Sequence, residues 1–130
     1  MSIFETRLRV YWEDTDGGGV VYYANYLRFL ERARTEWLRA KGIDQSTLAS
    51  ERSILFMVLR VEIDYRAPAR LDDLLLVTCE PIPEGRTTAV FRQQIFRDDE
   101  SRELLVEARV RVVCVDAKSL RPRRLSEYLP

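Results

Sequence analysis

The sequence predicts an α+β fold in which one five-stranded antiparallel sheet wraps around a single long helix. Several segments alternate apolar and polar side chains with a period of two, which is typical of half-buried strands. One stretch near the N-terminus instead repeats its apolar residues at helical spacing. No linker, internal repeat or low-complexity segment divides the 130 residues. We therefore expect residues 1–130 to form one domain.

The first predicted strand covers residues 6–13 and places Thr6, Leu8, Val10 and Trp12 on one face. The next six residues, DTDGGG, end in three consecutive glycines. Glycine can adopt positive φ or let the backbone approach a ligand closely. We therefore predict a functional loop directly after this strand.

The long helix is predicted over residues 22–41, because apolar residues recur there at spacings of three and four. Asn25 is a candidate N-cap residue, and Gly42 supplies the C-terminal stop. The predicted apolar face consists of Tyr22, Tyr26, Phe29, Leu30, Ala33, Trp37 and Leu38. A polar stretch with a short helical turn is expected next, around residues 44–51.

Four further strands are predicted after the helix. The second strand, around 59–66, alternates strictly, and the third begins near Leu74 as the apolar run LLLVTCE, which indicates burial on both faces. PIPEGR is expected to turn the chain into a fourth strand, about 87–97, and DDES to turn it into a fifth, about 103–116. We expect these strands to form a meander whose apolar face packs on the helix.

The rims of such a sheet carry unpaired backbone donors and acceptors. Pairing edge to edge with a second copy of the chain is a common way to satisfy them. We therefore predict a homodimer, with a homotetramer of paired dimers left open.

The amino-acid composition limits the classes of function that this protein can have. The chain has 21 Lys and Arg residues against 21 Asp and Glu residues, so no global field favours nucleic acid or an anionic membrane. The N-terminus lacks the apolar core of a signal peptide, and no apolar run approaches the ~20 residues of a membrane span. We expect a cytoplasmic protein without membrane insertion, in which Cys79 and Cys114 are reduced core residues.

The sequence contains no histidine. This excludes Ser-His-Asp and Cys-His nucleophiles and His-ligated zinc sites. We predict neither a metal nor a cofactor, so carboxylates and backbone dipoles must carry any chemistry.

The segment from the first strand to the helix brings a carboxylate beside the positive end of a helix. Unpaired N–H groups there can stabilise the oxyanion of a tetrahedral intermediate, while the carboxylate attacks a carbonyl carbon or activates a water. Asp16 is the candidate for this role, and capping of the glycine turn is its alternative. Asp14 is predicted to be structural, binding backbone groups of the loop.

Three motifs, EDTDGGGVVYYANYLRFLERARTEWLR, DYRAPARLDD and VVCVDAKSLRPR, extend over nearly the whole chain. They resemble the hotdog thioesterases of the 4-hydroxybenzoyl-CoA thioesterase type, especially the Tol-Pal-associated acyl-CoA thioesterases of bacteria. The resemblance implies a hotdog fold and hydrolysis of an acyl-CoA. It places the catalytic carboxylate on Asp16 and the N–H that polarises the thioester carbonyl on Tyr23. Arg86 matches a position where relatives carry basic residues that meet the coenzyme A nucleotide. The other predicted substrate-binding residues are Gly19, Val20, Tyr22 and Asn25, of which Tyr22 is a candidate lining residue of the acyl pocket.

The sequence departs from the Tol-Pal-associated pattern in having Tyr23 where those proteins usually have histidine. The backbone role survives this change, but short-chain and aromatic acyl groups both stay open, as do nucleophilic and general-base roles for Asp16. Arg86 alone is also compatible with a solvated surface charge. The alternative function is a non-catalytic acyl-CoA-binding or scaffold dimer. A hotdog dehydratase is disfavoured because it would need a histidine.

Overall fold

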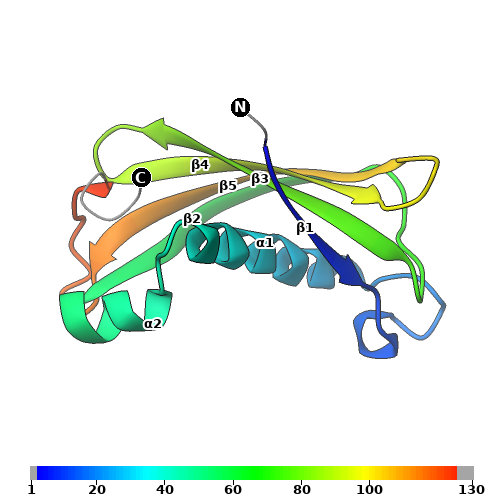
Figure 1. Ribbon diagram of the computed structural model, residues 1–130, viewed down its shortest axis with the longest axis horizontal. Helices are drawn as coiled ribbons and strands as arrows, with labels where there is room; N and C mark the ends of the chain where they lie inside the picture. Colours follow the sequence, from blue (N-terminus) through cyan, green and yellow to red (C-terminus); the bar gives the residue numbers. More distant parts are fainter. Residues whose placement is uncertain (1–2, 126–130) are drawn as a thin grey trace.

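The computed structural model describes residues 3–125. Its five strands form one antiparallel sheet in the order β1-β3-β4-β5-β2, and this sheet curls around α1 (Figure 1). The elements are β1 (Phe4–Arg9), α1 (Tyr26–Ala40), β2 (Ile54–Tyr65), β3 (Leu74–Glu84), β4 (Thr88–Arg97) and β5 (Leu104–Asp116). The predicted fold class, one helix enclosed by a five-stranded antiparallel sheet, is confirmed.

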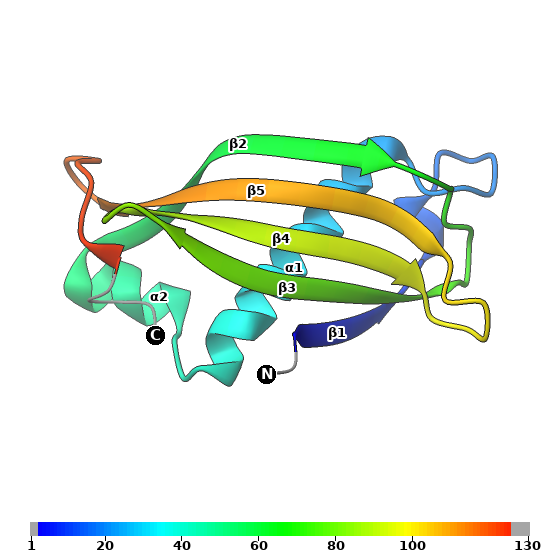
Figure 2. The ribbon, with the colours of Figure 1, turned by 90° about the horizontal axis from the view of Figure 1, so that it is seen from above.

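The strand order confirms the predicted meander only for β3, β4 and β5. β2 does not pair with β3, its neighbour in sequence, but lies at the opposite edge beside β5, while β1 pairs with β3 (Figure 2). Tight turns force consecutive strands to be neighbours, whereas longer connections leave this choice to packing. The connections on either side of β2 are long, which allows β2 to form the far edge.

α1 buries the predicted face, namely Tyr26, Phe29, Leu30, Ala33, Trp37 and Leu38. The helix begins four residues later than predicted, because Tyr23–Asn25 form a 3-10 turn. Tyr22 therefore lies outside the helix and is exposed rather than packed in the core. Asn25 occupies the N-cap position without capping it, since its side-chain amide donates to the Asp14 carbonyl instead. Gly42 follows the helix with a φ of 80°, as expected for a C-terminal glycine.

β1 is shorter than predicted and ends at Arg9. Trp12–Asp14 form a 3-10 turn, so Trp12 is exposed instead of sharing the inner face with Leu8 and Val10. The Asp14 carboxylate stabilises this turn by accepting the N–H of Tyr11.

The prediction that PIPEGR turns the chain is wrong for its first four residues, which belong to β3. The strand continues through Pro81 and Pro83 to Glu84, and the turn occupies residues 85–87. β1 pairs with β3 only as far as Cys79, so β3 is an edge strand beyond that residue and missing proline N–H groups are tolerated there. Between residues 75 and 79 the strand is buried on both faces, as predicted.

The short turn between α1 and β2 and the two buried cysteines agree with the sequence-based expectations. The short turn contains α2 (Gln45–Thr47) and a π-helical turn, Leu48–Arg52. Cys79 and Cys114 are buried free thiols. None of the helices within residues 3–125 is long and apolar enough to span a bilayer, and this part of the chain holds no group of three or more acidic, cysteine or histidine residues placed to bind a metal.

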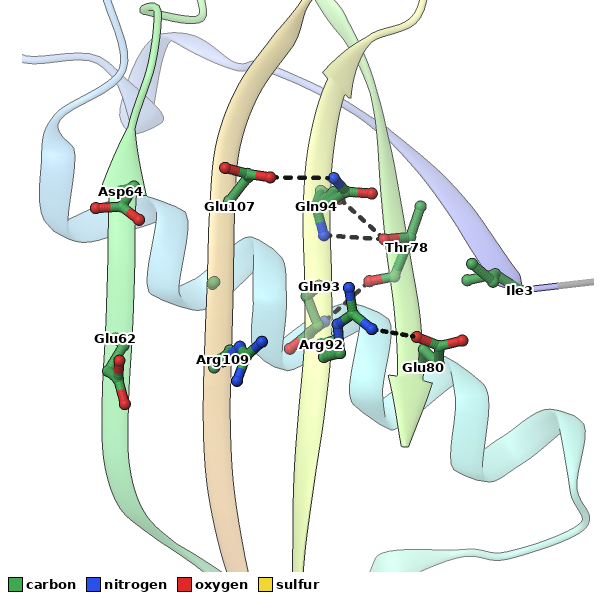
Figure 3. Close-up of a pocket in the computed structure, with 11 residues that line it drawn as sticks. Ile3, Glu62, Asp64, Thr78, Glu80, Arg92, Gln93, Gln94, Glu107 and Arg109 are labelled. Carbon is green, nitrogen blue, oxygen red and sulfur yellow. Dashed lines mark hydrogen bonds and ion pairs between the residues drawn. The ribbon is translucent and has the colours of Figure 1, made fainter. Parts of the chain in front are cut away.

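The sheet face directed away from α1 is strongly polar. A depression of about 300 Å³ lies on it, and charged side chains from adjacent strands surround this depression (Figure 3). Arg92 and Arg109 lie opposite each other on β4 and β5, and Arg92 pairs with Glu80 at 3.7 Å. None of the predicted site residues lines the depression, so it is separate from the predicted site.

Candidate active site

Asp14 connects β1 to the start of the helix. Its side chain is buried, and its Oδ2 accepts the N–H of Tyr11 at 2.8 Å. Its carbonyl accepts the N–H of Tyr22 at 2.9 Å and the Nδ2 group of Asn25 at 2.8 Å. The two bonds to the carbonyl hold the ends of the glycine loop together, and the side chain stabilises the turn before it, so Asp14 has the structural role predicted for it.

Asp16 lies on the exposed side of the glycine loop. Its N–H donates to the carbonyl of Val20 at 3.1 Å, and its Oδ1 accepts the N–H of Gly18 at 2.7 Å. Gly17 and Gly19 have φ values of 88° and 89°, a conformation that side chains disfavour. The turn-capping role considered for Asp16 is therefore present, but it uses only one carboxylate oxygen. Oδ2 has no hydrogen-bond partner among residues 3–125.

Tyr23 is the first residue of the 3-10 turn that leads directly into α1. Its N–H makes no hydrogen bond within the described part of the chain, as is usual for the first N–H groups of a helix. The Tyr22 carbonyl, which belongs to the same peptide unit as the Tyr23 N–H, accepts the N–H of Asn25 at 2.8 Å, which fixes the orientation of that peptide. An unsatisfied, electropositive donor therefore follows the same loop that carries Asp16.

The connection between β2 and β3 holds the glycine loop in place. Val21 donates its N–H to the carbonyl of Ala69 at 2.9 Å, and Leu71 donates to the carbonyl of Gly19 at 3.1 Å. The N–H of Ala69 also donates to the hydroxyl of Tyr26 at 3.0 Å. Residues 69–71 thus tie the loop to the first turn of α1. These residues belong to the motif DYRAPARLDD, but the sequence pattern does not indicate this contact.

Tyr65, at the end of β2, lies beside the candidate site, a position that its alternating sequence pattern does not predict. Its hydroxyl donates to the carbonyl of Tyr23 at 3.2 Å, and its ring lies 6.4 Å from that of Tyr23. The Tyr22 and Tyr23 rings lie 4.9 Å apart. Contact with the Tyr23 hydroxyl raises the pKa of Tyr22, and burial raises that of Tyr65. Both groups are therefore protonated at neutral pH and can donate hydrogen bonds.

The remaining predicted binding residues fall into two places. Gly19, Val20 and Asn25 lie around the loop, although the Asn25 amide N–H is already bound by Asp14. Arg86 is exposed in the turn between β3 and β4, at the opposite end of the sheet from the glycine loop (Figure 1). One chain therefore does not bring Arg86 to Asp16.

A five-stranded sheet wrapped around one long helix is the arrangement that the resemblance to hotdog thioesterases implies. The chain belongs to the thioesterase superfamily, whose family model matches residues 18–104. The fold is accordingly a hotdog fold, and the protein is a thioester hydrolase.

Among the similar proteins are two bacterial relatives. The acyl-CoA thioester hydrolase YbgC of Escherichia coli O6:H1 is 47% identical over 98% of this chain and 93% of its own length. The acyl-CoA thioesterase YbgC of Haemophilus influenzae is 45% identical over 92% of this chain and 85% of its own length.

Solved structures show the same fold. A probable thioesterase from Bartonella henselae superposes with a TM-score of 0.87 at 34% identity, covering 95% of this chain and 99% of that one. Slr0204 from Synechocystis, a 1,4-dihydroxy-2-naphthoyl-CoA thioesterase, superposes with a TM-score of 0.88 at 27% identity, covering 95% of this chain and 90% of that one.

Proposed function

We propose that the protein hydrolyses acyl-CoA thioesters, with Asp16 as nucleophile or general base and the N–H of Tyr23 as the donor to the carbonyl oxygen. The observation that carries this proposal is the N–H of Tyr23 at the start of α1, which follows the Asp16 loop. Among residues 3–125, neither this N–H nor Oδ2 of Asp16 has a hydrogen-bond partner. The names of the YbgC relatives support coenzyme A as the thiol.

Two routes lead to the same products. In the nucleophilic route, an oxygen of Asp16 bonds to the thioester carbon, the C–S bond breaks, the thiolate leaves and takes up a proton, and water hydrolyses the mixed anhydride. In the general-base route, Asp16 takes a proton from a water whose oxygen bonds to the same carbon. The C–S bond then breaks, and the thiolate leaves and takes up that proton. Both routes place negative charge on the carbonyl oxygen, where the Tyr23 N–H binds it. After a single turnover in ¹⁸O-labelled water, label in the Asp16 carboxylate would identify the covalent route.

The acyl group is proposed to be short-chain or aromatic. The exposed rings of Tyr22, Tyr23 and Tyr65 provide flat apolar surface beside the loop, which suits a planar acyl group. The relative from Synechocystis, named for an aromatic acyl-CoA, is compatible with this choice, whereas the YbgC names specify no acyl group.

A panel of acyl-CoA thioesters tests the proposal. We expect the wild-type protein to release free thiol from at least one member of a series from acetyl-CoA to octanoyl-CoA and benzoyl-CoA, measured with a thiol-reactive dye. The Asp16→Asn variant serves as the background for each substrate. Absence of release from every thioester, combined with binding of acyl-CoA by calorimetry, would instead support the non-catalytic binding function.

We further propose that the protein forms a homodimer through β2. This edge strand is unusual in exposing apolar side chains along its length: Leu55, Met57, Val58, Leu59, Val61 and Tyr65. An exposed edge with apolar side chains favours pairing with a second strand. A homotetramer of such dimers and a cytoplasmic location stay predictions.

Dimerisation through β2 would give Arg86 a place at the site. Antiparallel pairing of two β2 strands puts the Tyr65 end of one copy beside the Ile54 end of the other. The turn that carries Arg86 lies at the Ile54 end, because its last carbonyl binds the N–H of Cys114, a β5 residue opposite the start of β2. Arg86 of one copy would then lie at the same end of the dimer as Asp16 of the other. We propose that it contacts the coenzyme A nucleotide there.

The dimer can be tested by placing a charge on the β2 edge. Leu59 is 58% exposed, so Leu59→Lys should leave the fold of one chain intact while like charges oppose each other across the pair. We expect the mass measured by sedimentation to fall to that of a monomer. Leu120→Lys is the control, since Leu120 is similarly exposed at 53% but lies outside β2. An unchanged mass for Leu59→Lys would contradict pairing at this edge.

A further inference from the structure

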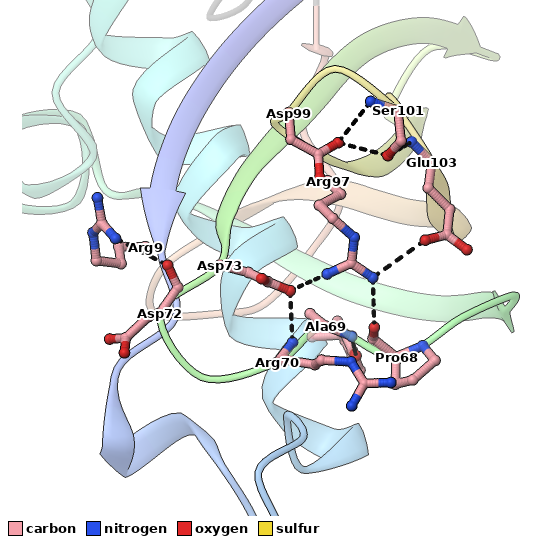
Figure 4. Close-up of polar contacts among 11 residues, drawn as sticks. Arg9, Pro68, Ala69, Arg70, Asp72, Asp73, Arg97, Asp99, Ser101 and Glu103 are labelled. Atoms are coloured by element: carbon pink, nitrogen blue, oxygen red, sulfur yellow. Dashed lines mark hydrogen bonds and ion pairs between the residues drawn. The ribbon is translucent and has the colours of Figure 1, made fainter.

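Arg97, the last residue of β4, makes several contacts with the connection between β2 and β3 (Figure 4). Its Nη1 group binds the carboxylate of Asp73, and its Nη2 group donates to the carbonyl of Pro68 at 3.0 Å. Nη2 also contacts Glu103 at 3.3 Å. The Arg97 side chain is only 16% exposed and that of Asp73 only 21%, so solvent screens this pair less than a surface ion pair.

These contacts hold both ends of the short segment 68–73. Pro68 begins the segment and Asp73 ends it, and one guanidinium binds both. The Asp73 carboxylate also accepts the N–H of Arg70 at 2.8 Å, while the N–H of Asp73 donates to the Arg70 carbonyl at 3.1 Å. Backbone hydrogen bonds between Val10 and residues 72 and 73 hold the β3 end of the segment as well, but the contact to Pro68 at its other end comes from Arg97.

The residues in between are those that bind the glycine loop. Gly19 and Val21 hydrogen-bond to Leu71 and Ala69, and Ala69 also binds the Tyr26 hydroxyl at the start of α1. A continuous series of contacts thus runs from Arg97 through segment 68–73 to both halves of the proposed active site. One half is the loop that carries Asp16, and the other is the helix start that presents the Tyr23 N–H.

We propose that Arg97, through Asp73 and Pro68, is a positioning residue that sets the Asp16 loop relative to the Tyr23 N–H; this inference rests on the proposed function. This positioning role requires arginine, because the planar guanidinium donates to a carboxylate and to a carbonyl at fixed angles. A lysine would keep the charge but lacks this fixed geometry. Hydrolysis needs the carboxylate and the N–H to reach one carbonyl together, and a displacement of about 1 Å can cost about a hundredfold in rate.

Kinetics of Arg97→Lys test the proposal in the full-length protein. We expect kcat to fall by about tenfold to a hundredfold while KM changes by less than about twofold, because Arg97 positions the reacting groups without touching substrate. Arg7→Lys is the matched control. Arg7 also pairs with an aspartate near the end of β4, Asp98, at 3.0 Å, but within the described chain it makes no hydrogen bond or ion pair with segment 68–73. The kcat of the Arg7→Lys variant should stay at the wild-type value.

A double variant separates positioning from general loss of structure. If Arg97 acts through Asp16, adding Arg97→Lys to Asp16→Asn should change the residual rate by less than about twofold. A purely structural role would lower the residual rate by the same factor as in the wild-type background, and that result would overturn the proposal. An Asp16→Asn variant as active as wild type would refute the proposed function instead.

Hydrogen exchange supplies a measure that does not depend on activity. In Arg97→Lys we expect faster amide exchange in residues 17–22 and 66–73, with the central strands β4 and β5 unchanged. Arg7→Lys should leave both segments at wild-type rates. Unchanged exchange in residues 17–22 of Arg97→Lys would show that Arg97 does not control the loop.

Discussion

Replacing Asp16 by asparagine is expected to reduce thioester hydrolysis by about 10²- to 10⁴-fold. The asparagine side-chain oxygen can still accept the N–H of Gly18, which Asp16 binds at 2.7 Å. The loop should therefore keep its conformation, while neither a nucleophilic nor a basic oxygen remains. The rate of thiol release under saturating acyl-CoA measures the loss, and an unchanged melting temperature would assign it to chemistry rather than folding.

Asp99→Asn is the matched control for this substitution. Asp99 also lies in an exposed turn and accepts the N–H of the residue two positions later, Ser101, at 3.0 Å. The two variants make the same chemical change in the same local geometry, but Asp99 lies on the turn between β4 and β5. We expect wild-type rates for Asp99→Asn. If Asp16→Asn also hydrolysed acyl-CoA at the wild-type rate, Asp16 would have no part in catalysis.

Replacing Tyr23 by proline is expected to lower kcat by about 10²- to 10³-fold, as removal of an oxyanion donor does in other hydrolases. Proline deletes the N–H while accepting the backbone conformation at the first position of a helical turn. Tyr22 has φ −63° and ψ 129°, which is the conformation required before proline. Since the Tyr23 N–H has no partner within residues 3–125, its removal breaks no internal hydrogen bond.

Tyr23→Ala separates the backbone from the side chain at this position. It removes the ring that packs against Tyr22 and Tyr65 but keeps the N–H. We expect a much smaller change in kcat than for proline, together with a change in acyl preference across the substrate panel. Equal losses of kcat in Tyr23→Pro and Tyr23→Ala would show that the side chain, not the N–H, is required.

Together these variants distinguish the two function classes that the sequence leaves open. A binding or scaffold protein should retain acyl-CoA affinity and release no thiol, whichever residue occupies positions 16 and 23. A hydrolase should lose turnover in Asp16→Asn and Tyr23→Pro while still binding substrate. Binding measured by calorimetry beside turnover therefore assigns the class from the same preparations.

Local sequence patterns predicted most of the elements and part of the site. Period-two alternation located β1, β2 and β5, a continuous apolar run located β3, and helical spacing located the buried face of α1 from Tyr26 to Leu38. The expected loop-binding role of Asp14 is present. Two of the misplaced boundaries have local causes. The Asp14 side chain stabilises a 3-10 turn where β1 was expected to continue, and the side chain of Asn25 binds Asp14 instead of capping α1.

The sequence by itself determined the periodicity of each element, the core face of the helix and the absence of imidazole chemistry, because these depend only on the order and type of residues. Only the tertiary structure decided that β2 forms the far edge, that Tyr65 meets Tyr23, and that Arg97 binds both ends of segment 68–73. It also placed Arg86 at the opposite end of the sheet from Asp16. These arrangements join residues that are far apart in the chain. Which residues meet depends on the long connections and on the strand register, and local periodicity encodes neither of these.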